Sequence, residues 1–555
     1  MRDTGTSPGL APGAAQKRPR DLRLDFFRGI AMFIILLAHT PGNTWTLWIP
    51  ARFGFSDATE IFVFCSGMAS ALAFGAVFSE RSFGLGTARI AFRVWQVYWA
   101  HIGILLVTAL MLFAIDHYGV GNRDVPYIHG PYVVPLFEQT GEALIGLFTL
   151  TYVPGLFDIL PMYLVILAMI PLVMLAHRVG GIPLAFVLIL VTWTMANLAG
   201  YARVIGRLDD PADWQRAIAA MGEPFLWMNL PSFPWGDNTW FFNPFAWQLI
   251  FFTGFAFGMG WLPAPPVKRW LVILAAAYVL LVLPFAWFKI HGGQYLPADL
   301  TIFGWSPHAA IAAARDFIEP YRWKTWQGLG RYTHFLALGY LAWVAVGPGG
   351  VRLREGYGAP GTAPVWVLGV AAALVVAFLP YVLVAELHMH APGLEAWLLR
   401  IDWLGLTHIT AEGEHLLADP SQIGLYQLLF GIALLLLVWA SLPKANREWL
   451  TRDAFLRAVP VIRKVGTQSL AVFMVSIPLA RFNGWVMDVV GRDVWTRAGV
   501  NLTGFAILIA VAYVVGWFKR QPWRNSARPA AMTQPPGGAA RPERPSGSPV
   551  PAQRA

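Results

Sequence analysis

Arg28 and His39 lie eleven positions apart in the first apolar stretch of the chain, a spacing that places both on one face of a helix. At a rise of roughly 1.5 Å per residue they are separated by about 16 Å along the axis. Ionisable groups inside a bilayer are costly unless they face a cavity or a partner, so the pair predicts a functional site, with Asp25 one turn before the arginine. The alternative is that Arg28 snorkels to the headgroups and His39 caps a loop.

The residues after His39 indicate what the imidazole could do. Thr40, Pro41 and Gly42 follow it, so the helix is predicted to end there with the histidine at its mouth. Asp57 and Glu60 share a face at the start of the next apolar stretch, near the same membrane boundary. A carboxylate beside a histidine fixes its tautomer and raises its basicity, as a general base that deprotonates a hydroxyl requires. The alternative is that Asp57 and Glu60 form a capping box.

A second group of cations suggests an anion site. Arg89 and Arg93 are one turn apart at the inner end of the third apolar stretch, where two guanidinium groups favour a diphosphate. Flanking residues of an ordinary membrane helix explain them equally well. Further polar residues interrupt the apolar stretches; each alone is typical of a contact between helices, but together they predict a polar, substrate-binding interior: Asp158, Tyr163, Asn243, Gln248, Arg331, His334, Gln468 and Ser469.

Two other features carry no chemistry of their own. Ser66 precedes Gly67 without a nucleophile-elbow motif, so this dipeptide predicts close helix packing. Cys65 is the single cysteine, which excludes a disulfide framework. No Cys and His cluster has the spacing of metal ligands, so no metal site is expected.

Composition indicates which elements must position these residues. Hydrophobic residues make up 56% of the 555 and charged residues 13%, against about 25% charged in soluble domains, so we expect an all-α, polytopic transmembrane bundle. The net charge of +10 comes from short basic clusters beside apolar stretches, which is a membrane pattern rather than a nucleic-acid footprint.

We expect a disordered cytoplasmic segment over 1–20, one transmembrane domain over 21–518 and a disordered basic tail over 519–555. About twelve helices are predicted, with ten plus re-entrant segments as the alternative, and the eighth and eleventh are the least clear. Their ranges are 26–44, 57–79, 90–116, 157–178, 182–201, 241–261, 270–290, 328–347, 364–386, 422–442, 467–489 and 499–518.

Basic residues predict the orientation of the bundle. With twelve crossings all of the basic clusters fall on one side of the membrane. We therefore expect a protein of the bacterial inner membrane with both termini in the cytoplasm. The longer connections, at 117–156, 202–240, 291–327 and 387–421, then lie outside and are rich in aromatic residues. These aromatics belong to interfacial belts or form platforms that stack against sugar rings.

The segment LDFFRGIAMFIILLAHTPGN resembles the opening helix of the acyltransferase-3 family of integral membrane O-acyltransferases. Together with FGFSDATEIFVFCSG, FDILPMY, FNPFAWQ and GRYTHFLALGY, it is similar to the OpgC branch, associated with succinylation of osmoregulated periplasmic glucans. The resemblance spans about 21–518. It implies that Arg28 and His39 are the essential pair, that cytoplasmic acyl-CoA is the donor and that a glycan hydroxyl is the acceptor. The family commonly has about ten spans, whereas this sequence predicts twelve.

We therefore expect a membrane O-acyltransferase with no bound cofactor. Acyl-CoA phosphates would lie near Arg28, Arg89 and Arg93, and His39, oriented by Asp57 or Glu60, would deprotonate the glucan hydroxyl. A relay through an acylated histidine stays open. The alternatives are a transporter or flippase of a glycan, lipid or organic anion, and a structural membrane protein; the sequence does not specify an oligomeric state. No inverted repeats or paired broken helices support a transporter.

Overall fold

The computed structural model describes residues 21–525 except 294–295, 297, 299, 359–360 and most of 386–424, where 393, 408–409 and 415–416 are described. The predicted disordered segment 1–20, most of the tail 519–555 and most of the connection 387–421 therefore lie outside the described residues. The described elements are helical apart from β1 (His408–Ile409) and β2 (His415–Leu416), which pair antiparallel.

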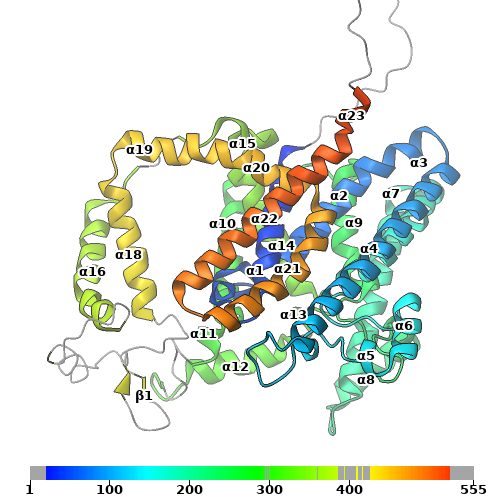
Figure 1. The fold of residues 1–555 in the computed structure, drawn as a ribbon, viewed down its shortest axis with the longest axis horizontal. Coiled ribbons are helices and arrows are strands. Elements are labelled where there is room, and N and C mark those ends of the chain that lie inside the picture. Colours follow the sequence, from blue (N-terminus) through cyan, green and yellow to red (C-terminus); the bar gives the residue numbers. More distant parts are fainter. Residues whose placement is uncertain are drawn as a thin grey trace, which may run out of the picture.

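The long helices run side by side as a bundle, as expected for an all-α membrane protein (Figure 1). Their bounds are α1 Leu22–His39, α2 Ala58–Ser70 continued by η3 Ala71–Gly75 and α3 Ala76–Glu80, α4 Phe83–His117, α7 Ile159–Ile205, α9 Pro244–Met259, α10 Arg269–Ala286, α14 Leu329–Val346, α16 Val365–Ala385, α18 Leu425–Ser441, α20 Phe455–Thr467, α21 Ser469–Val490 and α22 Val494–Arg520.

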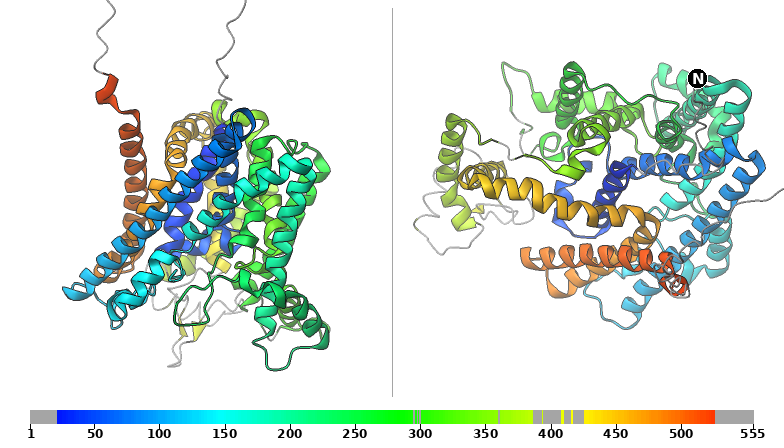
Figure 2. Two further views of the ribbon diagram at one scale, coloured as in Figure 1. Left: turned by 90° about the vertical axis from the view of Figure 1, so that its right-hand side faces the viewer. Right: turned by 90° about the horizontal axis from the view of Figure 1, so that it is seen from above.

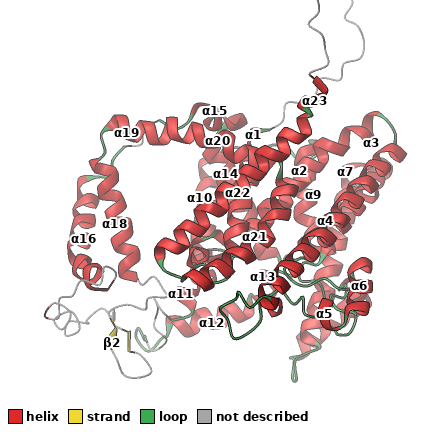
Figure 3. Ribbon diagram, viewed as in Figure 1, coloured by secondary structure: helices red, strands yellow, loops and turns green. Residues whose placement is uncertain are grey.

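Short helices occupy the connections, which we had expected only as loops. At one end of the bundle are η1 Thr44–Trp48, η2 Pro50–Arg52, η4 Tyr127–His129, α5 Pro135–Glu138, α6 Thr140–Thr149, α8 Asp213–Gly222, η5 Glu223–Met228, α11 Phe288–His291, α12 Pro307–Phe317 and α13 Glu319–Arg322. Toward the other end are η6 Pro348–Gly350, α15 Arg352–Glu355, α19 Lys444–Glu448, η7 Trp449–Ala454 and α23 Pro522–Asn525. Figures 2 and 3 show these ends and the loops that join them.

Six helices in the described part of the chain are long and apolar enough to cross a membrane, or up to eight if each of two bent pairs is one span. They support a multi-pass membrane protein, but they do not confirm twelve crossings. Every predicted apolar stretch does contain a helix. Several fall short as spans because α9 has only 16 residues and α1 carries three charged residues in its first two turns.

The fourth and fifth predicted helices are joined in one element, α7, of 47 residues. At about 1.5 Å per residue a straight helix of that length would extend about 70 Å, more than twice the roughly 30 Å hydrocarbon core. The backbone is not helical at Gly180 and Gly181, and Gly181 has a φ of 68°. This break is at the boundary that the sequence predicts between 157–178 and 182–201.

Glycines bring the helices around the site into close contact. A Cβ at Gly67 would clash with the backbone oxygen of Phe251, and one at Gly254 with that of Phe64, so α2 and α9 touch backbone to backbone. Gly29 likewise faces the backbone of Ile462, which joins α1 to α20. Small residues allow such approach between membrane helices. Close packing, predicted for the Ser66 and Gly67 dipeptide, is confirmed for Gly67.

Candidate active site

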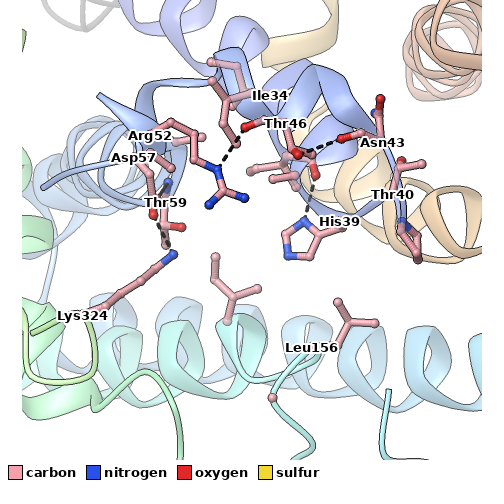
Figure 4. Close-up of a pocket in the computed structure, with 18 of the residues that line it drawn as sticks. Ile34, His39, Thr40, Asn43, Thr46, Arg52, Asp57, Thr59, Leu156 and Lys324 are labelled. Atoms are coloured by element: carbon pink, nitrogen blue, oxygen red, sulfur yellow. Dashed lines mark hydrogen bonds and ion pairs between the residues drawn. The ribbon is translucent and has the colours of Figure 1, made fainter. Parts of the chain in front are cut away.

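A cavity of about 640 Å³ opens where α1 ends, and it is called the outer cavity because α1 is predicted to end on the outer side of the membrane. It lies between the end of α1, the turns η1 and η2, and the starts of α2 and α7. Lys324 lines it as well. Figure 4 shows the side chains of His39, Arg52 and Lys324 around one open space. The polar residues that line it are His39, Thr40, Asn43, Thr44, Thr46, Arg52, Asp57, Thr59, Asp158 and Lys324, and its aromatic residues are Phe241, Phe242 and Phe473.

His39 is the last residue of α1, where the sequence predicts the helix to end. Its Nδ1 lies 2.8 Å from the backbone oxygen of Ile35, one turn earlier. A carbonyl oxygen can only accept a hydrogen bond, so Nδ1 must carry the proton, and Nε2 is the nitrogen with a free lone pair. The local helix therefore holds His39 in the tautomer that a general base needs.

The turn after His39 is anchored to a distant helix. Asn43 and Asn501 of α22 exchange two side-chain hydrogen bonds, of 2.9 and 3.1 Å, and both residues are buried. Asn43 also caps η1 through the backbone N–H of Trp45. Because both amides are buried and satisfy each other, the pair ties the η1 turn to α22.

Asp57 caps α2 and forms an ion pair across the cavity. Its carboxylate accepts the backbone N–H of Thr59 and lies 2.6 Å from Nζ of Lys324. Burial by itself would raise the pKa of Asp57, but the charges of Lys324 and Arg331 outweigh it and hold the pKa below its ordinary value. The carboxylate is therefore a stable anion that balances Lys324.

Glu60 completes the capping box with Asp57, which is the alternative that the sequence left open. Its side chain accepts the backbone N–H of Asp57 at 2.8 Å and binds Arg331 of α14 at 2.6 and 2.9 Å. Glu60 is fully buried, where an ionised carboxylate requires a partner of opposite charge. This pair lies behind the cavity and not in its lining.

The expected contact between a carboxylate and His39 is not what the structure has. Nδ1 of His39 binds the Ile35 carbonyl, and both carboxylates bind cations instead. The physical reason is that cations within reach stabilise a buried carboxylate more than a neutral imidazole does. Asp57 still shares the cavity lining with His39, but it faces Lys324.

Most of the other polar residues predicted from α7, α9 and α14 hold helices together. Asn243 caps α9 and donates to the carbonyl of Met228, and Gln248 donates to the carbonyl of Ile189 at 2.7 Å. His334 lies 2.8 Å from the Ser56 hydroxyl, beside the cap of α2. None of these three lines the outer cavity, and Arg331 pairs with Glu60, so the substrate-binding role of these four residues stays a prediction.

Asp158 is the exception, since it lines the outer cavity and precedes α7. Its side chain accepts the backbone N–H of Phe242 at 3.2 Å. Burial raises its pKa well above the ordinary value, so the carboxyl is shifted toward its neutral form.

A second cavity of about 950 Å³, called the inner cavity, lies nearer the start of α1. It brings together Arg28, Arg89, Arg93 and Tyr163, four residues that the sequence predicts to bind substrate, and adds Lys519. Nη2 of Arg28 donates to the Ser66 hydroxyl at 3.0 Å. Among the described residues, no carboxylate lines this cavity, so four cations share it.

Asp25 is buried in the first turns of α1 and does not line either cavity. A Cβ at Gly466 of α20 would clash with its backbone oxygen, so it lies where α1 crosses α20. The substrate-binding role expected of Asp25 therefore stays a prediction, with the residue outside both linings.

Two stacked aromatic rings lie close to both cavities. Ile159 lines the outer one and Tyr163, one turn later in α7, lines the inner one. In α21, Phe473 lines the outer cavity and Met474 lines the inner one. The ring of Phe473 stacks on Phe62 of α2 at 5.9 Å, and the Arg28 guanidinium carbon lies 5.8 Å from the Phe62 ring. This aromatic pair therefore lines the outer cavity through Phe473 and lies near Arg28 of the inner cavity through Phe62.

A family model described as OpgC protein matches residues 20–361 and 358–520, which is most of the chain. The chain belongs to the OpgC family. No curated protein and no solved structure matches it. OpgC membership implies a membrane acyltransferase that modifies a glycan.

Sequence reasoning missed two residues in the outer cavity of this OpgC-family protein, Arg52 and Lys324. A signal was present. Both lie in connections predicted to face outward, where Lys and Arg are normally scarce because cytoplasmic loops carry the excess. Other cations, such as Arg315 and Arg322, also lie in these connections, so this signal alone does not single out Arg52 and Lys324.

Proposed function

We propose that this protein moves a succinyl group from cytoplasmic acyl-CoA to a hydroxyl of a periplasmic glucan in the bacterial inner membrane. The observation that carries the proposal is α1, which presents Arg28 to a cationic cavity and His39 to a second cavity at its other end. The first suits a polyanionic donor and the second suits removal of a proton.

The inner cavity would hold the nucleotide part of the donor. Arg28, Arg89 and Arg93 offer guanidinium forks that fit phosphate oxygens, and Lys519 adds a fourth charge. The helical rise separates Arg28 from His39 by about 16 Å, which suits the extended pantetheine arm of CoA. Displacement of the Phe62 and Phe473 rings would open the path for the thioester.

Transfer in the outer cavity would then need one base. Nε2 of His39 takes the proton of the glucan hydroxyl while its oxygen attacks the thioester carbonyl carbon. The new C–O ester bond forms, the C–S bond breaks, and the proton passes from the imidazolium to the leaving thiolate. A relay, in which His39 first carries the acyl group, uses the same geometry with two transfers.

The acceptor would enter from the outer side. Phe241 and Phe242 line the outer cavity next to Lys324, whose Nζ lies 5.8 and 5.4 Å from the two ring centroids. Flat apolar faces next to hydrogen-bonding groups suit a sugar ring, which has apolar C–H faces and a polar rim. This arrangement supports a glycan as acceptor.

Thioester cleavage by the purified protein tests the proposal. With succinyl-CoA and periplasmic glucan, we expect release of free CoA thiol together with a succinyl mass increment on the glucan. A transporter or flippase would release no thiol, and that result would overturn the proposal. Glucans from cells that lack the protein should lose the same mass increment.

A further inference from the structure

Arg52 is a cation in the outer cavity, and no side chain in the described part of the chain forms an ion pair with it. It ends η2, and its Nε donates to the backbone oxygen of Thr46 at 3.2 Å. Its guanidinium carbon lies 5.9 Å from the ring centroid of Phe288, which supports the stem. Among the described residues, no carboxylate lies within ion-pair distance of Arg52. Figure 4 shows its terminal nitrogens in the open space between Lys324 and His39.

The other charges of the cavity are already accounted for. Lys324 is paired with Asp57 at 2.6 Å, and Arg331 behind the wall is paired with Glu60. Asp158 hydrogen-bonds to the Phe242 backbone, and burial favours its neutral form. Among the described lining residues, Arg52 is therefore the arginine or lysine without an ion pair, and its terminal nitrogens face the open space of the cavity (Figure 4).

We infer that Arg52 is a specificity-determining residue that binds the terminal carboxylate of a dicarboxylic acyl group. This inference rests on the proposed function and assigns to one residue the choice of acyl group. The guanidinium fork matches a carboxylate with two parallel hydrogen bonds, and its charge would be neutralised only when such a group is present.

The position of Arg52 indicates which part of the substrate supplies the anion. In the proposed function the phosphates of the donor belong with Arg28, which lines the inner cavity and not the outer one. What reaches His39 is the thioester and the chain beyond it. A carboxylate at the far end of that chain would lie in the same chamber as His39, which Arg52 lines.

The test compares two donors with the same four-carbon chain, succinyl-CoA and butyryl-CoA, which differ by a carboxylate in place of a methyl group. For purified Arg52→Gln we expect kcat/KM with succinyl-CoA to fall roughly 10- to 100-fold, while transfer from butyryl-CoA is unchanged. Arg52→Lys should retain part of the preference because it keeps the charge but loses the fork.

Arg216→Gln is the matched control, since Arg216 is an exposed arginine of α8 paired with Asp213 and does not line either cavity. It should keep the wild-type ratio between donors. Binding of CoA alone by Arg52→Gln should equal that of the wild type, which shows that the inner cavity is intact.

Equal loss with both donors would overturn the inference and make Arg52 a structural residue. A loss that follows the charge of the acceptor, measured with neutral and anionic glucans, would also overturn it, as would a wild-type preference for butyryl-CoA. A wild-type protein that transfers neither group would instead overturn the proposed function, and the inference with it.

Discussion

The two cavities of this protein use charge in opposite ways. The inner cavity collects Arg28, Arg89, Arg93 and Lys519 with no carboxylate in its described lining. The outer cavity pairs Lys324 with Asp57 and leaves Arg52 without an ion pair among its described lining, next to His39, whose Nδ1 is held by a backbone carbonyl. An excess of like charge suits a polyanion that arrives and leaves, whereas balanced charge suits a base that must stay unprotonated.

The same helix serves both cavities, which is why the contrast is informative. Arg28 and His39 belong to one continuous helix, so the distance between them does not depend on loops. The chemistry at each end is then set by what packs against α1: α4 and α22 bring cations to one end, while the segments at Asp57 and Lys324 bring an ion pair to the other. Each prediction below tests one side of this division.

The largest expected effect is all or none and concerns which compartment each cavity faces. A reporter fused after Gly119 should be active only in the periplasm, and one fused after Pro443 only in the cytoplasm. The first site lies beyond α4 and the second beyond α18. The opposite polarity at either site would show that the cavities are assigned to the wrong sides of the membrane.

His39→Ala should abolish acyl transfer while the protein still inserts and binds CoA. Loss of a general base costs about 10²–10⁴-fold in rate, on the order of 3–5 kcal/mol, and more if the histidine carries the acyl group. The measurement is thiol release by purified protein, with CoA binding as the control. Near-normal transfer by a folded variant would exclude the outer cavity as the place of reaction.

Arg28→Ala should raise the KM for the donor by roughly 10- to 100-fold, because a charged hydrogen bond to the donor is lost. Arg28→Lys should recover only part of this loss, since a lysine lacks the planar fork. Initial rates over a range of donor and acceptor concentrations separate the two effects. If the acceptor KM rises and the donor KM does not, the inner cavity is not the donor site.

Neutralising Arg89 or Arg93, the two arginines that α4 contributes to the inner cavity, should have a smaller effect. Arg89→Gln or Arg93→Gln should raise the donor KM roughly two- to fivefold, and the difference from wild type should shrink as salt is added. Both residues sit toward the exposed side of α4, where solvent screens their charge. A loss that is independent of salt would indicate a packing role instead.

The smallest expected effect concerns the pH dependence of Asp57→Asn. The pKa of Asp57 is depressed in the folded protein, so its stabilising ionisation persists above the ordinary value near 3.9 and is lost only as pH falls through the lower folded pKa. The activity ratio of wild type to Asp57→Asn should therefore stay constant between about pH 5 and 8. Activity and thermal unfolding measured across that range check this, and a ratio that changes would mean that Asp57 titrates there.

The parts of the site that sequence reasoning predicted are those that local geometry controls. The helical period placed Arg28 and His39 on one helix, and the Thr40 to Gly42 sequence marked where that helix ends. The i, i+3 spacing gave the capping box of Asp57 and Glu60. Grouping Arg28 with Arg89 and Arg93 was also confirmed as a shared cavity lining, although their role as donor contacts stays a prediction.

What the pattern could not predict is which distant side chain satisfies each buried charge. Glu60 was predicted to orient His39 because both lie near the same membrane boundary. It instead forms an ion pair with Arg331, which is far away in the chain. Several polar residues in apolar stretches, Gln248 among them, proved to join helices. A single sequence shows that a buried polar group needs a partner and does not show who supplies it.

The amino-acid order by itself determined a helical membrane protein whose first helix carries a cation and an imidazole on one face, because hydrophobicity and helical period act locally. Only the tertiary structure decided that Arg52 and Lys324 meet His39 in one cavity and that the Phe62 and Phe473 rings stack beside it. Those contacts join segments far apart in the chain. Their physical cause is the packing of whole helices through glycines and buried ion pairs, which no local pattern contains.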